Sequence, residues 1–135
     1  TGDCPLLAPE VCDLVLRKYL DRLEPPVEYI SNDTTASGWP DGTDVEIFSK
    51  RLLDETSAMA PEHASWVHGD REHVTSHMRR TQPQRIVWHM EDLRHLKLSV
   101  DCLEDLELVR RIYAHLPDGD YSLAATLEAL RRAEA

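Results

Sequence analysis

Two aspartates in distant parts of the chain occupy positions where an α/β domain binds its ligands. Asp3 precedes a turn marked by Pro5, and Asp101 lies between the apolar run 96–100 and a helical pattern. Ligands of open α/β sheets bind beyond the carboxyl ends of strands, where both aspartates would lie. Mg²⁺ takes one or two protein carboxylates plus phosphate oxygens, so the pair could share one ion. The alternatives are a turn residue at Asp3 and a helix cap at Asp101.

A second group of functional side chains lies in residues 70–75, where Asp70 predicts the start of a helix running to about residue 80. Arg71 carries a guanidinium fork that suits a carboxylate or phosphate, and Glu72 follows it. His73 could contact a ligand or exchange a proton. The alternative is a solvated helix start held by ion pairs. No cysteine or third histidine joins His73 and His77 in a zinc spacing, so no zinc site is predicted.

The segment 31–43 is long for a loop in a compact domain and contains the run Trp-Pro-Asp-Gly-Thr-Asp at 39–44. Pro-Asp-Gly favours a tight turn, which is one interpretation. The other is a lid or a sugar-contacting loop, because long loops are often functional.

Composition limits the class of protein. The chain has 135 residues and a formal net charge of −10, which favours a single domain over residues 1–135 and disfavours a nucleic-acid partner. Its three cysteines form no disulfide framework, which indicates a reducing compartment such as the cytoplasm. No apolar run is long enough for a membrane helix. The chain opens at Thr1 without an initiator methionine and is expected to be part of a longer protein.

Apolar periodicity predicts helices and strands in alternation, which is typical of an α/β domain. A helix begins at Pro9 and ends before Pro25, and Ser49 predicts the cap of a second helix. A capping box at Asp101 and Glu104 precedes a further helix, and the last begins near Ser122. Strands are predicted at 27–30, 44–48, 85–88 and 96–100.

Five segments, in order, are similar to one known family. They are residues 1–6 (TGDCPL), 29–32 (YISN), 40–46 (PDGTDVE), 71–75 (REHVT), and 98–101 (LSVD) with 104–109 (EDLELV). This order resembles the cytidylyltransferases of the spore-coat polysaccharide and acylneuraminate type, relatives of the CMP-sialic acid and CMP-Kdo synthetases. The resemblance covers nearly the whole chain. It implies part of a nucleotide-diphospho-sugar transferase fold, a Rossmann-like α/β sandwich with a mostly parallel sheet.

The resemblance also implies an activity. Family members are Mg²⁺-dependent transferases that join the α-phosphorus of CTP to an acidic sugar or similar acceptor and release pyrophosphate. Asp3 and Asp101 match the family's metal-binding, catalytic pair. The segment of Arg71, Glu72 and His73 matches a region near the acceptor site and the dimer contact. The segment containing Asp41, Asp44 and Glu46 maps near the acceptor pocket.

The chain departs from the family at its start. The family's N-terminal, nucleotide-binding half carries a Gly-rich loop with Arg and Lys that holds the triphosphate, and this chain has no such loop. We therefore expect the chain alone to be inactive and the parent protein to be the cytidylyltransferase. An exposed sheet edge predicts a homodimer. A non-catalytic binding or assembly module that keeps the fold remnant is the alternative.

Overall fold

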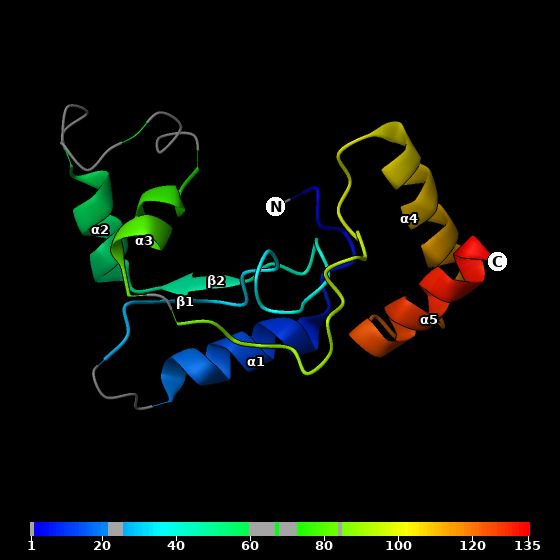
Figure 1. The fold of residues 1–135 in the computed structure, drawn as a ribbon, viewed down its shortest axis with the longest axis horizontal. Helices are drawn as coiled ribbons and strands as arrows, with labels where there is room; N and C mark the ends of the chain where they lie inside the picture. Colours follow the sequence, from blue (N-terminus) through cyan, green and yellow to red (C-terminus); the bar gives the residue numbers. More distant parts are fainter. Residues whose placement is uncertain (1, 22–25, 60–66, 68–72, 84) are drawn as a thin grey trace.

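The computed structural model describes residues 2–21, 26–59, 67, 73–83 and 85–135. Within these residues helices outnumber strands, and the two kinds of element are mixed along the chain. Figure 1 shows α2 and α3 at one end of the molecule and α4 and α5 at the other, with α1 and the strands between them. In chain order the elements are α1 (Pro9–Leu20), β1 (Tyr29–Ser31), β2 (Glu46–Phe48), α2 (Lys50–Ser57), α3 (Ser76–Thr81), α4 (Leu103–His115) and α5 (Leu123–Glu134).

The regular sheet among the described residues is one antiparallel pair. β1 and β2 pair with Tyr29 opposite Phe48 and Ser31 opposite Glu46. The strands predicted at 85–88 and 96–100 are reduced to isolated parallel bridges, Ser31 with Ile86 and Asp41 with Lys97. The α/β class and parallel pairing are therefore present, but the larger parallel sheet of the sequence prediction is not formed by these residues.

Three helix starts follow local capping rules. Ser49 caps α2 by accepting a hydrogen bond from the Leu52 amide at 3.0 Å. Ser122 caps α5 by accepting one from the Ala125 amide at 3.2 Å. Pro9 occupies the first position of α1, where its missing N–H costs nothing. These starts were predicted correctly because the signal lies within one turn of the helix.

Two predicted helix starts are wrong. The N-cap of α4 is Cys102, and the carboxylate that reaches back is that of Asp105, which accepts from the Cys102 amide at 3.2 Å. Asp101 is therefore not the cap. The helix predicted from residue 71 begins at Ser76, which leaves His73 in a turn, and the expected cap at Asp70 lies outside the described residues. Thr75 precedes α3 but makes no side-chain capping bond, and its hydroxyl donates to Glu46 at 2.6 Å.

The core forms where α1, α4 and α5 meet the 96–100 segment. A smaller cluster lies under β1, around Val15, Ile30 and Val87, and Tyr29 packs with Leu52 and Met78 beside α2 and α3. Burying these side chains supplies the main favourable term in folding. None of the helices in the described ranges is long and apolar enough to cross a membrane. The main cluster includes Leu6, Val11, Leu98, Val109, Ile112 and Leu130.

The 31–43 segment is packed into the molecule. Asn32 is fully buried and bridges the neck of this segment, donating to the Thr43 carbonyl at 2.7 Å and accepting from the Val45 amide at 2.7 Å. The Trp39 indole donates to the Val87 carbonyl at 2.8 Å. These buried bonds contradict the lid interpretation and favour the turn. The polar composition of this segment is typical of an exposed loop. In the structure its polar side chains instead form hydrogen bonds with buried backbone groups.

Candidate functional site

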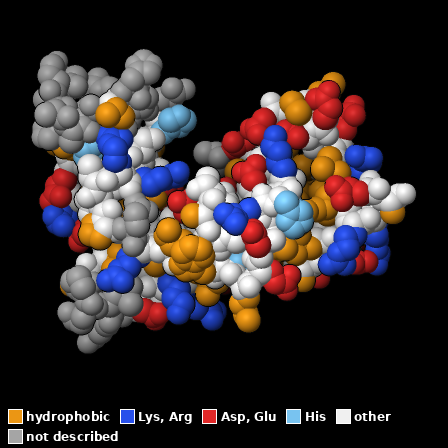
Figure 2. Space-filling model, in the orientation of Figure 1, with side chains coloured by type: hydrophobic (Ala, Val, Ile, Leu, Met, Phe, Trp, Pro, Cys, Tyr) orange, Lys and Arg blue, Asp and Glu red, His pale blue; other side chains and the backbone are white. Residues whose placement is uncertain are grey.

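The two aspartates predicted to bind a metal lie on neighbouring segments. The Asp3 carbonyl accepts a hydrogen bond at 2.8 Å from the amide of Val100, the residue before Asp101. Both aspartates are exposed. The chain therefore folds so that Asp3, although distant in sequence, lies beside the segment that leads into α4. Figure 2 shows acidic side chains gathered over the N-terminal end of α4, where Asp101, Glu104 and Asp105 lie.

Lys97 neutralises part of this acidic surface. Its ammonium lies 2.7 Å from the Asp101 carboxylate and 2.6 Å from that of Asp105. The hydrogen bond from Lys97, with that from the Asp101 amide, holds the pKa of the Asp105 carboxyl well below its usual range. Hydrogen bonds to Asp101 and Asp105 raise the pKa of Lys97. Exposed ion pairs contribute only about 0–1 kcal/mol, so a divalent ion could displace Lys97 from Asp101.

The donor set of this region fits Mg²⁺ held jointly with a nucleotide. Carboxylate oxygens are the ligands Mg²⁺ prefers, and it keeps several positions for water and phosphate. Within the described ranges no group of three or more His, Cys, Asp or Glu side chains could hold a metal ion by itself. Asp3 and Asp101 therefore suit an ion that arrives with phosphate oxygens, and not a preformed cage.

A cavity of about 640 Å³ is lined in part by Cys4, the residue after Asp3. It brings Cys4 together with three predicted binding residues, Asp44, Glu46 and His73. Of the other predicted binding residues, Asp41 does not line it, and Arg71 and Glu72 lie outside the described residues. Sequence reasoning missed the remaining lining residues, which are Phe48, Val74, Thr75, Ser76 and Arg79.

Asp41 has a structural partner instead. Its carboxylate accepts a hydrogen bond from the Ser99 hydroxyl at 2.6 Å, and its backbone bonds with Leu96 and Leu98 at 3.1 and 2.8 Å. Asp41 therefore joins the 40–44 turn to the strand-like segment that ends at Asp101. Its contribution to the site is to position that segment.

Asp44 is exposed at the cavity and oriented by its own loop. One carboxylate oxygen accepts from the Thr34 hydroxyl at 2.7 Å, and the other lies 3.4 Å from the Gly42 amide. The second contact is long, so that oxygen keeps capacity to accept from a ligand hydroxyl. His73 is also exposed at the cavity.

Glu46 is held by three side chains. It accepts hydrogen bonds from the Tyr29 hydroxyl, from the Thr75 hydroxyl at 2.6 Å, and from Arg79 at 2.8 and 3.2 Å. Partial burial acts to raise the pKa of the Glu46 carboxyl, but these bonds outweigh it and hold the pKa below its usual value. Burial and the bond to Glu46 raise the pKa of Tyr29 to about 12.

The lowered pKa of Glu46 predicts a pH-dependent contribution to stability. A carboxyl whose folded-state pKa is depressed stabilises the fold above its unfolded pKa, about 4.3, and loses that contribution as the pH falls through the folded value. At about pH 6, Glu46→Gln should lower the free energy of unfolding by about 2 kcal/mol. Urea unfolding at about pH 3 should show a smaller difference between the two proteins. An unchanged difference would mean that the charge of Glu46 contributes nothing.

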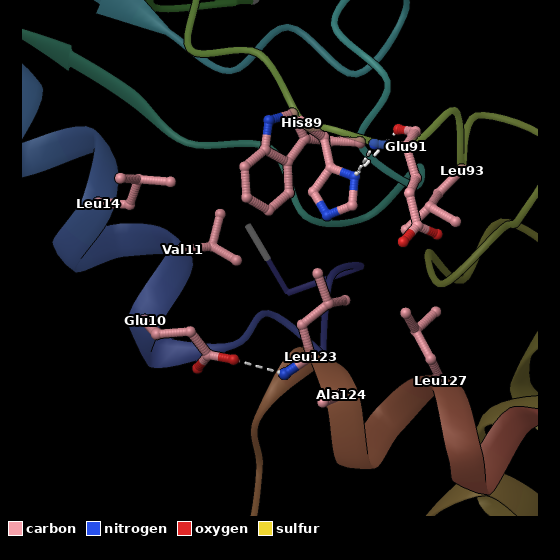
Figure 3. A pocket seen from close by; sticks show the side chains of 10 residues that line it. Glu10, Val11, Leu14, His89, Glu91, Leu93, Leu123, Ala124 and Leu127 are labelled. Atoms are coloured by element: carbon pink, nitrogen blue, oxygen red, sulfur yellow. Dashed lines mark hydrogen bonds between the residues drawn. The ribbon is translucent and has the colours of Figure 1, made fainter.

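A second, more apolar cavity lies between α1, α5 and the 89–93 segment, with a volume of about 340 Å³ (Figure 3). Leucines and Val11 form much of its wall, and none of the predicted site residues lines it. Glu10 at its edge accepts from the Leu123 amide at 2.6 Å, which satisfies the start of α5. Of these two cavities, the one that Cys4 lines is thus the one that contains predicted site residues.

Comparison with known proteins supports the fold. The sequence matches no family model and no curated protein. The structure is similar to that of a cytidylyltransferase from Leptospira borgpetersenii serovar Hardjo-bovis (strain JB197), with a TM-score of 0.82 and 21% sequence identity. The match covers 98% of this chain and 54% of that one, so the chain spans about half its length. At this identity the likeness shows a shared partial α/β fold.

Proposed function

We propose that this chain supplies the metal-binding aspartates and the acceptor-binding wall of a Mg²⁺-dependent cytidylyltransferase. The observation that carries the proposal is the hydrogen bond between the Asp3 carbonyl and the Val100 amide, 2.8 Å long, which joins the Asp3 and Asp101 segments, while Cys4, the residue after Asp3, lines the cavity. The fold shared with a solved cytidylyltransferase supports the same reaction class.

In the proposed reaction, a hydroxyl oxygen of an acidic sugar or similar acceptor forms a bond to the α-phosphorus of CTP. The bond from that phosphorus to the bridging oxygen breaks, pyrophosphate leaves, and the hydroxyl loses its proton. Bound Mg²⁺ would neutralise triphosphate oxygens and stabilise the charge that develops during displacement. Asp3 and Asp101 would hold that ion, Asp44 would accept a hydrogen bond from the acceptor, and His73 lies where it could take up a proton.

The transfer reaction is proposed for a whole protein and not for this segment alone. The solved cytidylyltransferase is about twice as long as the region that matches. We propose that a nucleotide-binding half joined to this chain holds the base and completes the triphosphate site, of which this chain keeps the metal-binding part. We also propose a homodimer, and we keep Arg71 and Glu72 as acceptor-binding residues on the resemblance alone.

A non-catalytic assembly module is the second candidate, and one observation favours it. Trp88 and Met90, two residues apart in the chain, expose large apolar side chains. Exposed apolar patches mark surfaces that bind partners. A module would use such a surface without needing the two aspartates, so metal-dependent nucleotide binding separates the two candidates.

Calorimetric titration of CTP into the chain, with and without Mg²⁺, tests the proposed function. We expect saturable binding with Mg²⁺ and its loss when EDTA removes the ion, because the aspartates contact the triphosphate through the metal. Binding that is equal in EDTA, or no binding by a folded sample, would contradict the proposal for this chain.

A further inference from the structure

Glu46 lines the cavity, and its carboxylate already accepts four hydrogen bonds from the protein. Oε1 accepts from the Tyr29 hydroxyl and from Arg79, at 3.2 Å from Nε and 2.8 Å from Nη2. Oε2 accepts from the Thr75 hydroxyl at 2.6 Å. The side chain is only 21% exposed. Glu46 is therefore poorly placed to bind an acceptor hydroxyl, unlike the exposed Asp44 in the same wall.

The partners of Glu46 connect two elements that are distant in the sequence. Glu46 begins β2, whereas Thr75 and Arg79 belong to the turn before α3 and to α3 itself. The Arg79 bonds span 33 residues of chain. Since Thr75 does not cap α3, the bond to Glu46 is the contact that directs its hydroxyl. The Glu46 carboxylate thus fastens the 73–79 wall of the cavity to the sheet.

Tyr29 fixes the other side of this connection. It is fully buried and packs with Leu52 and Met78, and Met78 lies on α3 between the two residues that bond to Glu46. Two guanidinium nitrogens of Arg79 donate to the same Glu46 oxygen, Oε1, and hydrogen bonds between charged groups are stronger than neutral ones. Because the wall is fixed on both sides, His73 at its start should hold one position relative to Asp44.

We propose that Glu46 is a positioning residue that sets the position of the 73–79 wall, and thereby the shape in which the cavity receives the acceptor. The inference rests on the proposed function, because it assigns different roles to two residues of the proposed acceptor site. Asp44 contacts the acceptor, and Glu46 acts through Thr75 and Arg79. The resemblance had assigned Glu46 itself to acceptor binding.

The test uses Cys4, which lines the same cavity, as a reporter in a Cys12→Ser, Cys102→Ser background. Thr75→Val removes the hydroxyl that donates to Glu46, and Thr75→Ser keeps it. We expect Thr75→Val and Glu46→Gln to raise the rate of Cys4 alkylation by iodoacetamide at least about threefold and to move the His73 ring signals in NMR spectra. Thr75→Ser should give the same alkylation rate and the same His73 signals as the parent chain, because serine keeps the hydroxyl that donates to Glu46.

Two controls separate positioning from general destabilisation. Ser122→Ala removes the cap of α5 and should cost about 1 kcal/mol without changing either signal. Asp54→Asn removes an exposed charge that pairs with Lys50 on α2 and does not line the cavity, so it too should leave both signals unchanged. Unchanged Cys4 and His73 signals in Thr75→Val would overturn the inference even if Glu46→Gln did not fold.

These readouts need neither CTP nor metal. The proposed function fails, and the inference stands, if CTP does not bind but Thr75→Val still changes both signals. The opposite result, Mg²⁺-dependent CTP binding with unchanged signals, leaves the function standing and rejects the positioning role of Glu46.

Discussion

Replacing Asp3 or Asp101 with asparagine is expected to abolish Mg²⁺-dependent CTP binding while the chain stays folded. An amide cannot supply the charge that attracts a divalent ion, and the ion is the contact between these residues and the triphosphate. Losing several kcal/mol of such stabilisation corresponds to at least about a hundredfold weaker binding. Calorimetry of each variant with Mg²⁺ and CTP measures the effect directly.

Stability should change little in either variant. Asp101 is paired with Lys97 at the surface, and such a pair contributes about 0–1 kcal/mol. The amides at the start of α4 are served by Asp105, so Asp101→Asn leaves the helix cap intact. Asp118→Asn, an exposed aspartate in the turn after α4, is the matched control and should bind as the parent chain does. Equal binding in the Asp3 and Asp101 variants would reject the metal site.

Gly42→Ala is expected to have the largest effect on stability. Gly42 has a φ of +89°, and a Cβ placed there would lie 2.5 Å from the Ser99 amide nitrogen and 2.6 Å from the Leu98 carbonyl carbon. Both atoms are backbone, so relief requires the 40–44 turn to move away from the 98–99 segment. Backbone strain and overpacking each cost about 1–3 kcal/mol, so Gly42→Ala should lower the free energy of unfolding by about 2–6 kcal/mol. Urea unfolding would show this loss.

Gly119 supplies the control for Gly42. It also has a positive φ, +77°, but no atom lies within 4 Å of a Cβ placed there. Gly119→Ala should therefore cost only the backbone strain, about 1–2 kcal/mol. If both substitutions cost the same, the close approach of Gly42 to the segment before Asp101 contributes nothing, contrary to the structure.

The sequence predicts elements with local signals well. Ser49 and Ser122 cap helices as their spacing indicates, because the side chain and the amide it serves lie in one turn. The strands at 85–88 and 96–100 carry β-forming residues, but they make only single bridges. Strand pairing depends on neighbours supplied from elsewhere, and β propensity reports only that a segment suits a sheet.

Long-range polar contacts decide what the sequence could not predict. Asp101 and Asp105 both suit a cap, and only the fold shows that Asp105 serves the amides while Lys97 holds Asp101. The family resemblance assigned Glu46 to acceptor binding, whereas in the structure its carboxylate accepts hydrogen bonds from Thr75 and Arg79, which are distant in sequence. By contrast, the nearness of Asp3 and Asp101 was predicted from general rules for strand ends.

The most direct test of the central claim, that Asp3 and Asp101 form one divalent-ion site, is NMR with Mn²⁺ and CTP in place of Mg²⁺ and CTP. Paramagnetic Mn²⁺ broadens the amide signals nearest to it. The account predicts that signals of residues 2–4 and 100–102 broaden together at substoichiometric Mn²⁺, and that Asp3→Asn abolishes both effects. Broadening at only one segment, at a different acidic surface, or at neither with CTP saturating would contradict it.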